Sequence, residues 1–273
     1  MPSTPLTTAR VLVVQATPVP QDLEANLAAA LGLLAANPDA DLAVFPELFL
    51  TGYSLAGIER LALEPDAEPI GRLRAAAAQY GTAVVIGFAE RIPGRFPGNS
   101  ALCLDERGQI AGIYRKVHLF GAEVDHFTAG EAYPLVGLLG RRVAPLICYD
   151  LEFPEPARTV ATAGAELLVT ISANMEPFGG EHDLFARARA VENRLAHVYV
   201  NRTGAESGWV FVGGSQAVDP SGRVLAVLGR EPQVRLVEVP IGARFDDGEL
   251  PDYLADRRPD IPAVEVGFRG GRR

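Results

Sequence analysis

Apolar positions along the chain fall into two kinds of segment that alternate. Short Val-, Leu- and Ile-rich runs without polar alternation are typical of buried strands, and they cover 10–16, 41–45, 82–88, 142–148 and 166–172. Leu/Ala-rich stretches between them predict helices over 22–36, 69–80 and 154–163, with Asp22 as a cap and Gly81 and Gly164 as stops. The alternation indicates an α/β fold of sheets covered by helices.

Further elements complete this pattern. Strands at 100–105 and 109–114 predict a hairpin, and 210–218 with 223–228 predicts a second one. A helix is expected over 182–196, with strands at 197–202 and 234–239. Strand, helix and strand at 10–46 are loosely echoed at 142–172, too weakly to define a repeat.

We expect a single domain over 1–273, because no low-complexity linker divides the chain before residue 240. Residues 241–273 are rich in Arg, Asp, Gly and Pro. They are predicted to form a C-terminal arm that lies on the body or on a partner subunit.

Composition narrows the class of protein. The net charge of −9 argues against binding to nucleic acid or to an anionic membrane surface. The apolar runs are too short to span a bilayer, and residues 1–10 lack the order of a secretory signal. Two cysteines make neither a disulfide framework nor a zinc site. We therefore expect a cytoplasmic protein without a metal or cofactor.

The use of lysine is the most unusual feature of the composition. Lysine and arginine together number 25, and Lys116 is the only lysine. Arginine is a permanently charged fork, whereas lysine is a compact ammonium whose pKa shifts readily on burial. An arginine-biased chain can leave one lysine by chance, so the neighbourhood of Lys116 has to decide.

Three segments place reactive groups where predicted strands end. Glu47 follows the apolar run 43–46, Lys116 lies in YRKVHL at 114–119, and Cys148 opens CYDLEFPE at 148–155. Each has an ordinary alternative: a solvated acid, a surface cation and a small buried apolar residue. Together they match one chemistry, because a cysteine nucleophile needs a base for its proton and a cation for the developing oxyanion.

In this order, FPE at 45–47, YRKVHL and CYDLEFPE resemble the nitrilase or carbon–nitrogen hydrolase superfamily. The resemblance runs from about residue 10 to 260 and includes Gln15, SAN at 172–174, RARAVENR at 187–194, NRTG at 201–204 and ADRRPD at 255–260. It implies a four-layer α-β-β-α sandwich that pairs into a homodimer or larger homo-oligomer. It also implies an enzyme that needs no cofactor.

The resemblance further implies a Glu–Lys–Cys triad at Glu47, Lys116 and Cys148. A second glutamate past the lysine matches Glu123, although Asp125 is close enough to compete for that place. In the implied mechanism, Glu47 takes the thiol proton and the thiolate attacks a carboxamide. Lys116 and the Tyr149 N–H hold the oxyanion, and water aligned by Glu123 releases the acid from a thioester.

Within the superfamily, the CYD opening resembles the amidase branches. Relatives that act on dicarboxylic monoamides often carry Arg at the place of Glu152, which would repel a substrate carboxylate. We therefore expect a small aliphatic carboxamide, neutral or amine-bearing, with Tyr149, Glu152 and Asn174 at the substrate. A salt bridge from Glu152 to Arg158 or another arginine is the alternative. Phe120, Phe178 and Trp209 are candidate pocket walls.

Other functions stay open. The substrate could instead be an N-carbamoyl amino acid or an ω-amide. Four histidines allow a Cys–His hydrolase, a reading ranked below the triad, with His118 more readily an orienting residue; they are His118, His126, His182 and His197. A scaffold without turnover is the third alternative, although it would not need the three catalytic residue types.

Overall fold

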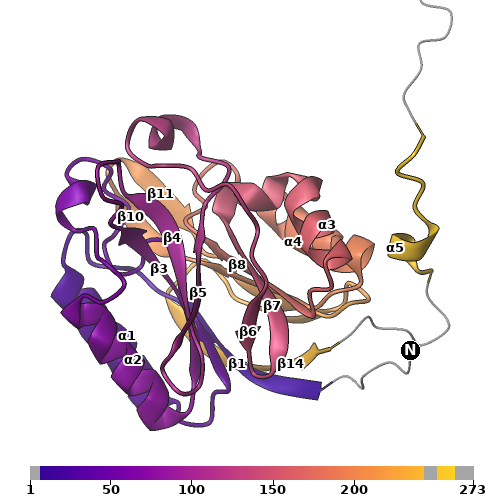
Figure 1. Ribbon diagram of the computed structural model, residues 1–273, viewed down its shortest axis with the longest axis horizontal. Coiled ribbons are helices and arrows are strands. Elements are labelled where there is room, and N and C mark those ends of the chain that lie inside the picture. The colour runs from indigo at the N-terminus through magenta and orange to yellow at the C-terminus, as the bar shows by residue number, and fades with distance from the viewer. Residues whose placement is uncertain (1–6, 243–250, 262–273) are drawn as a thin grey trace, which may run out of the picture.

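The computed structural model describes residues 7–242 and 251–261, and this part of the chain holds two six-stranded sheets packed face to face (Figure 1). The first sheet has the order β14 (Gln233–Ile241), β1 (Thr7–Gln15), β2 (Leu42–Val44), β3 (Ala83–Glu90), β4 (Gly98–Leu104) and β5 (Ile110–Arg115). The second has the order β13 (Val224–Val227), β12 (Gln216–Val218), β9 (His197–Asn201), β8 (Leu167–Ser172), β7 (Arg141–Ile147) and β6 (Val136–Leu138).

Helices cover the outer faces of both sheets. The first sheet is covered by α1 (Leu23–Ala36) and α2 (Glu68–Tyr80), and the second by α3 (Pro154–Thr162) and α4 (Gly179–Asn193) (Figure 1). This arrangement confirms the predicted four-layer α-β-β-α sandwich. Smaller elements complete it: the 3-10 turns η1 (Ile58–Arg60), η2 (Gly121–Asp125) and η3 (Cys148–Glu152), the hairpin β10 (Thr203–Glu206) and β11 (Trp209–Val212), and α5 (Tyr253–Asp256).

Strand β1 shows why the sequence gives this layering. Val11 and Val13 belong to the apolar core that the two sheets share, whereas Leu12 and Val14 belong to the core under α1 and α2. Successive side chains of a strand point to opposite faces, so a strand buried on both faces must be apolar at every position. The apolar run at 10–16 is uninterrupted because both faces of β1 are buried.

The two sheets repeat the same sequence of strand directions. In the first sheet, β1, β2 and β3 are parallel and are joined through α1 and α2; in the second, β7, β8 and β9 are parallel and are joined through α3 and α4. Each parallel set is flanked by one antiparallel strand on one side and two on the other. The loose echo between 10–46 and 142–172 thus corresponds to equivalent parts of the two sheets.

Some predicted boundaries were wrong. The expected strand 210–218 is broken at Gly213 and Gly214, which both have positive φ, and its first half pairs with β10 instead of β13. The helix predicted over 182–196 begins and ends three residues earlier. In the described residues, no helix has the length and apolar character needed to cross a membrane.

Part of the expected C-terminal arm lies on the body. The Arg194 guanidinium at the end of α4 lies 4.8 Å above the Tyr253 ring and donates to the Pro251 carbonyl, and Leu254 is buried. Residues 243–250 and 262–273 of that arm lie outside the described residues.

Candidate active site

Glu47 lies in a tight turn that follows β2 and packs against β3. The Gly87 N–H donates to the Pro46 carbonyl, and the Leu50 N–H donates to the Gly87 carbonyl, both at 3.1 Å. A Cβ at Gly87 would lie 2.2 Å from the Leu48 nitrogen, so only glycine permits this approach. Leu48 has a positive φ of 48°. The turn thus holds the Glu47 side chain, which is fully buried, at one end of the sheets.

Lys116 follows β5 directly and lies between two carboxylates. Its N–H donates to the Asn99 carbonyl of β4 at 2.9 Å, which fixes where the side chain begins. The Lys116 Nζ is 2.7 Å from Glu47 Oε1 and 2.9 Å from Glu123 Oε2, and all three side chains are fully buried. Burial opposes the charge of Lys116, but the carboxylates of Glu123 and Glu47 outweigh burial and raise its pKa well above the usual value. Lys116 is therefore a charged donor.

The two carboxylates differ in what surrounds them. Glu123 accepts hydrogen bonds from four donors, which are Lys116 Nζ, Asn99 Nδ2, the Tyr53 hydroxyl and the Phe120 N–H. Glu47 uses only Oε1, which accepts from Lys116 and from Asn99 at 2.6 Å. Its Oε2 is buried and has no partner among the described residues. Glu47 therefore has an oxygen free to receive a proton, whereas Glu123 is fully engaged in holding Lys116.

The surroundings of Glu47 also favour proton uptake. Burial raises the pKa of Glu47 because water no longer solvates the anion, and the charge of Glu123 adds to the increase. The charge of Lys116 and its hydrogen bond act in the opposite direction, and the pKa stays raised. A carboxylate with a raised pKa and an unoccupied oxygen is suited to general base catalysis near neutral pH.

Cys148 opens the turn η3 immediately after β7. Its φ of 46° lies in the left-handed region, which is strained for a residue with a Cβ and is found at functional turns. Asp150 braces the turn, because its carboxylate accepts from the Ile147 N–H at 3.1 Å, the Tyr114 hydroxyl at 2.6 Å and the His118 N–H at 2.9 Å. Tyr114 and His118 flank Lys116 in sequence, so this carboxylate ties the Cys148 turn to the segment that carries the lysine.

The charges of the cluster act on the Cys148 thiol. Burial raises its pKa, and the negative charge of Glu47 raises it further, whereas the positive charge of Lys116 acts to lower it. The pKa remains above the usual value, so the resting group is a thiol. A thiol nucleophile of this kind needs a base that accepts its proton during attack. Glu47 is the candidate, because its carboxylate is close enough for its charge to raise the pKa of Cys148.

The cavity at Cys148 is small. It holds about 10 Å³ of free space, which is room for about one water molecule. Its walls are mostly apolar and aromatic, and they are formed by Tyr53, Phe120, Cys148, Tyr149, Glu152, Asn174, Met175 and Phe178. The Phe120 ring packs edge-on against Tyr149 at 5.3 Å and Phe178 at 5.9 Å. The described pocket is therefore suited to a small group.

Tyr149, Glu152 and Asn174, predicted at the substrate, all line this cavity. The Asn174 side chain donates to the Phe178 carbonyl and accepts from the Met175 N–H, so both of its polar atoms shape the loop that follows β8. Glu152 Oε1 lies 3.2 Å from His182 Nε2. Among the described residues, no salt bridge joins Glu152 to Arg158 or to another arginine, and its ion-pair partner is His182 instead.

Comparison with known proteins gives the lineage. The family model for carbon–nitrogen hydrolases matches residues 10–243. An (R)-stereoselective amidase from a Pseudomonas species is 41% identical over 237 residues, which cover 86% of each chain. A hydrolase encoded in the pqqF 5′ region of Pseudomonas protegens is 39% identical over 93% of this chain and 90% of its own.

The chain belongs to the carbon–nitrogen hydrolase family.

Solved structures agree with this assignment and with its amidase-like branch. A crystal structure of an amidase from Nesterenkonia sp. has a TM-score of 0.81 and 34% identity, and the match covers 92% of this chain and 93% of that one. A variant of the amidase from Nesterenkonia sp. AN1, with a TM-score of 0.82 and 34% identity over 92% of this chain and 94% of that one, carries the acetamide moiety of fluoroacetamide covalently on its active site cysteine. Our chain is thus a carbon–nitrogen hydrolase, an enzyme that acts on carbon–nitrogen bonds.

The histidines of this hydrolase lie apart from the thiol. In the part of the chain that the structure describes, no hydrogen bond or ion pair joins a histidine to Cys148. His118 contacts Asp150 through Nδ1 at 2.9 Å and stacks on Phe153 at 4.1 Å, an orienting position. His197 bonds to Thr170 at 2.8 Å, and burial lowers its pKa to about 4. This arrangement favours Glu47 over a histidine as the base.

Other expectations are settled by exposure. Asp125 is exposed whereas Glu123 is buried, so Glu123 is the acid that meets Lys116. Phe120 and Phe178 are pocket walls as predicted, but Trp209 is 41% exposed and does not line this cavity. Within residues 7–242 and 251–261, no group of three or more His, Cys, Asp or Glu side chains could hold a metal ion.

Sequence reasoning missed the polar residues that hold the cluster together. Asn99 and Tyr53 both donate to the carboxylates, and Ser172 lies beside Cys148. Asn99 follows a glycine at the start of an apolar strand, and Tyr53 follows a Thr-Gly pair, so neither stands out from ordinary loop or strand-end composition. Only the pairing of β4 with β5 brings Asn99 to Lys116.

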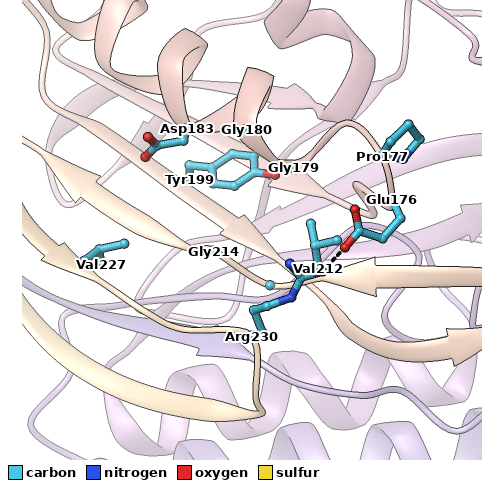
Figure 2. A pocket seen from close by; sticks show the side chains of 11 residues that line it. Glu176, Pro177, Gly179, Gly180, Asp183, Tyr199, Val212, Gly214, Val227 and Arg230 are labelled. Carbon is cyan, nitrogen blue, oxygen red and sulfur yellow. Dashed lines mark hydrogen bonds and ion pairs between the residues drawn. The ribbon is translucent and has the colours of Figure 1, made fainter.

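A larger cavity of about 290 Å³ lies on the other side of the loop that follows β8. Residues of this loop face both spaces in turn, because Met175 and Phe178 line the small pocket whereas Glu176 and Gly179 line the large one. Figure 2 shows Arg230 reaching Glu176 at this cavity. The ring of Tyr199 forms part of its wall (Figure 2).

Proposed function

We propose that this carbon–nitrogen hydrolase is a cysteine-dependent amidohydrolase. Its expected reaction is the cleavage of a small aliphatic carboxamide, neutral or amine-bearing, to the acid and ammonia through a thioester on Cys148. The observation that carries the proposal is the buried cluster of Glu47, Lys116 and Glu123 beside the Cys148 turn, with one oxygen of Glu47 free. The amidase relatives and the covalent adduct on the cysteine of one of them support the same chemistry.

The first half-reaction forms the thioester. Glu47 Oε2 accepts the Cys148 proton while the sulfur attacks the carboxamide carbon, and the carbonyl oxygen becomes an oxyanion. The Lys116 ammonium and the Tyr149 N–H donate to that oxyanion, which lowers the barrier because the donors are in place before charge develops. The carbon–nitrogen bond then breaks, the proton passes from Glu47 to the leaving nitrogen, and ammonia departs.

The second half-reaction releases the acid. Glu47, again unprotonated, accepts a proton from water, whose oxygen attacks the thioester carbon. Collapse of the second oxyanion breaks the carbon–sulfur bond, and Glu47 returns its proton to the Cys148 sulfur. Glu123 keeps Lys116 in position throughout, since it accepts a hydrogen bond from the ammonium and is itself held by three further donors. These steps need neither a metal nor an organic cofactor.

The pocket supports the choice of substrate class. Its free space of about 10 Å³ favours a small acyl group, and its aromatic walls favour an aliphatic one. Glu152 places a carboxyl group at the pocket, 25% exposed. A carboxylate there repels a second carboxylate on the substrate, which disfavours ω-amides and N-carbamoyl amino acids, and it attracts an amine.

Ammonia release from a panel of substrates tests the proposal. The panel contains neutral aliphatic amides, amine-bearing amides, ω-amides, N-carbamoyl amino acids and nitriles, with Cys148→Ala as the control. We expect release from neutral or amine-bearing amides and none from the control. Release from the ω-amides alone would overturn the substrate class. A folded protein that releases ammonia from no substrate would favour the scaffold alternative.

A further inference from the structure

Ser172 lies beside the nucleophile by virtue of sheet register. Strands β7 and β8 are parallel neighbours, and Ile147 pairs with Ile171. The next residues on the two strands are Cys148 and Ser172, so their side chains emerge side by side at the same edge of the second sheet. The Ser172 side chain acts on the Cys148 thiol to lower its pKa, against the effect of burial.

The partners of Ser172 determine which way its proton points. Its Oγ accepts from the Tyr199 hydroxyl at 3.3 Å and from the Asn174 N–H at 3.2 Å. A serine hydroxyl has two acceptor sites and a single proton. With both acceptor sites used, that proton is left for the remaining neighbour, the Cys148 sulfur.

Tyr199 is held in the donor role by its own neighbour. The Tyr199 hydroxyl oxygen lies 2.9 Å from His182 Nδ1. Burial raises the pKa of Tyr199 well above its usual value, so the phenol keeps its proton and donates it to Ser172. His182 Nδ1 must then carry a proton and donate to the Tyr199 oxygen, because two acceptors cannot face each other at that distance.

The chain ends on the wall of the substrate pocket. His182 Nε2 faces Glu152 Oε1 at 3.2 Å, and the His182 side chain is only 2% exposed. The imidazole thus links the Tyr199 hydroxyl to the Glu152 carboxyl group on the pocket wall. If His182 held its proton on Nε2 alone, Tyr199 would have to donate to Nδ1, and Ser172 would lose the donor that directs its own proton.

We propose that Ser172 is a further catalytic residue, whose hydroxyl donates a hydrogen bond to the Cys148 sulfur. Tyr199, His182 and Glu152 are then positioning residues that set the direction of this hydrogen bond. The proposal rests on the proposed role of Cys148 as the nucleophile. The Ser172 donor stabilises the thiolate as it forms and as it leaves the thioester. No bond other than hydrogen bonds changes along the chain, so it adds no chemical step.

The same strand supplies a matched control. Thr170 lies two residues before Ser172 in β8, is fully buried and shares a hydrogen bond with an imidazole, that of His197, at 2.8 Å. This pair also joins a buried hydroxyl to an imidazole, but Thr170 lies two residues earlier in β8 and is therefore further from Cys148. Thr170→Val removes a buried hydroxyl of the same kind at nearly constant volume.

The test compares alkylation of Cys148 by iodoacetamide with steady-state ammonia release for a set of folded variants. Removal of a hydrogen bond to a charged group lowers a rate by about 10- to 100-fold. We expect Ser172→Ala to slow alkylation and kcat by this amount with KM nearly unchanged, whereas Thr170→Val stays near the wild-type rates. Tyr199→Phe should show a smaller decrease in both rates.

His182 supplies a rescue experiment. His182→Asn retains a donor at the position of Nδ1, whereas His182→Leu removes it, so Asn should retain faster alkylation than Leu. If Ser172→Ala does not fold, this pair and Tyr199→Phe still decide. Equal rates for Asn, Leu and Thr170→Val would overturn the chain, and so would wild-type alkylation of Ser172→Ala. Alkylation does not depend on turnover, so failure to find an amide substrate affects the proposed function and leaves this test intact.

Discussion

The two cysteines of this protein are both buried, but their surroundings are chemically opposite. Cys103 lies near the end of β4 and belongs to the apolar core between the sheets. Burial alone raises its pKa to about 12. Cys148 follows β7 directly and has a positive φ, and its pKa is also raised, first by burial and then by the charge of Glu47.

The difference lies in the neighbours. Within the described part of the chain, burial is the sole influence on the pKa of Cys103, and no group there acts as a specific acceptor for its proton. Cys148 has a carboxylate oxygen without a partner, an ammonium and a serine hydroxyl within interaction range. The comparison teaches that reactivity here does not come from a low thiol pKa at rest, which is the usual sign of a reactive cysteine. In the proposed mechanism it comes from Glu47, an acceptor that takes the proton as the sulfur attacks.

Substitution of Cys148 should have the largest effect on activity, and substitution of Cys103 should have almost none. Cys148→Ala should abolish ammonia release, a loss of more than about 10⁴-fold, because the attacking atom is gone. Cys103→Ala should leave kcat/KM within about twofold and lower the free energy of unfolding by about 1 kcal/mol through lost packing. Steady-state assays and urea unfolding of both variants measure these effects. Substantial activity in Cys148→Ala would remove the basis of the comparison.

Removal of the proposed base, Glu47, should have the next largest effect on kcat. Glu47→Gln is expected to lower kcat by about 10²- to 10⁴-fold, because the thiol proton no longer has an acceptor. The carboxylate form of Glu47 is the active one, so wild-type kcat/KM should rise as the pH increases through its pKa. Burial raises that pKa, so this increase should lie above pH 4.5, the ordinary value for the carboxyl group.

The exposed Asp125 is the control for Glu47, since it is an acid close in sequence to Glu123 but outside the cluster. Asp125→Asn should keep both the rate and the acidic limb of the pH profile. An unchanged acidic limb in Glu47→Gln would assign the limb, and the role of base, to another group.

Lys116→Arg is expected to lower kcat by about 10²- to 10³-fold while the fold stays intact. The guanidinium keeps the charge, but its larger planar fork cannot take the place of an ammonium held between two carboxylates at 2.7 and 2.9 Å. Arg115→Lys is the matched reverse change, in a partly buried pair with Glu90 outside the cluster, and should have little effect on kcat. Near-normal turnover of Lys116→Arg would show that catalysis does not require a compact ammonium at this position.

The sequence was sufficient to predict the layers and the meeting of Glu47 with Lys116. Strands buried on both faces leave continuous apolar runs, and the chemistry stands where those runs stop, as at Glu47 and Cys148. The single lysine in a chain rich in arginine pointed to Lys116 before any geometry was known.

The rest depends on pairing between distant segments, which local patterns do not encode. Trp209 and Phe211 are both aromatic and lie in one strand, yet Phe211 packs beside Tyr53 and Trp209 is exposed. Ser172 and Tyr199 become partners only through the register of β8 and β9. The break of the predicted strand at Gly213 was also missed, because a glycine within a strand pattern does not reveal its φ.

Site-resolved labelling of the native enzyme tests the central claim most directly. Fluoroacetamide is added at neutral pH, and peptide mapping by mass spectrometry follows the modification of Cys148 and Cys103 over time in wild type and in Glu47→Gln. We predict that Cys148 is modified at least about 100-fold faster than Cys103, and that Glu47→Gln removes most of this advantage. Equal modification of the two cysteines, or an advantage that survives in Glu47→Gln, would contradict the account.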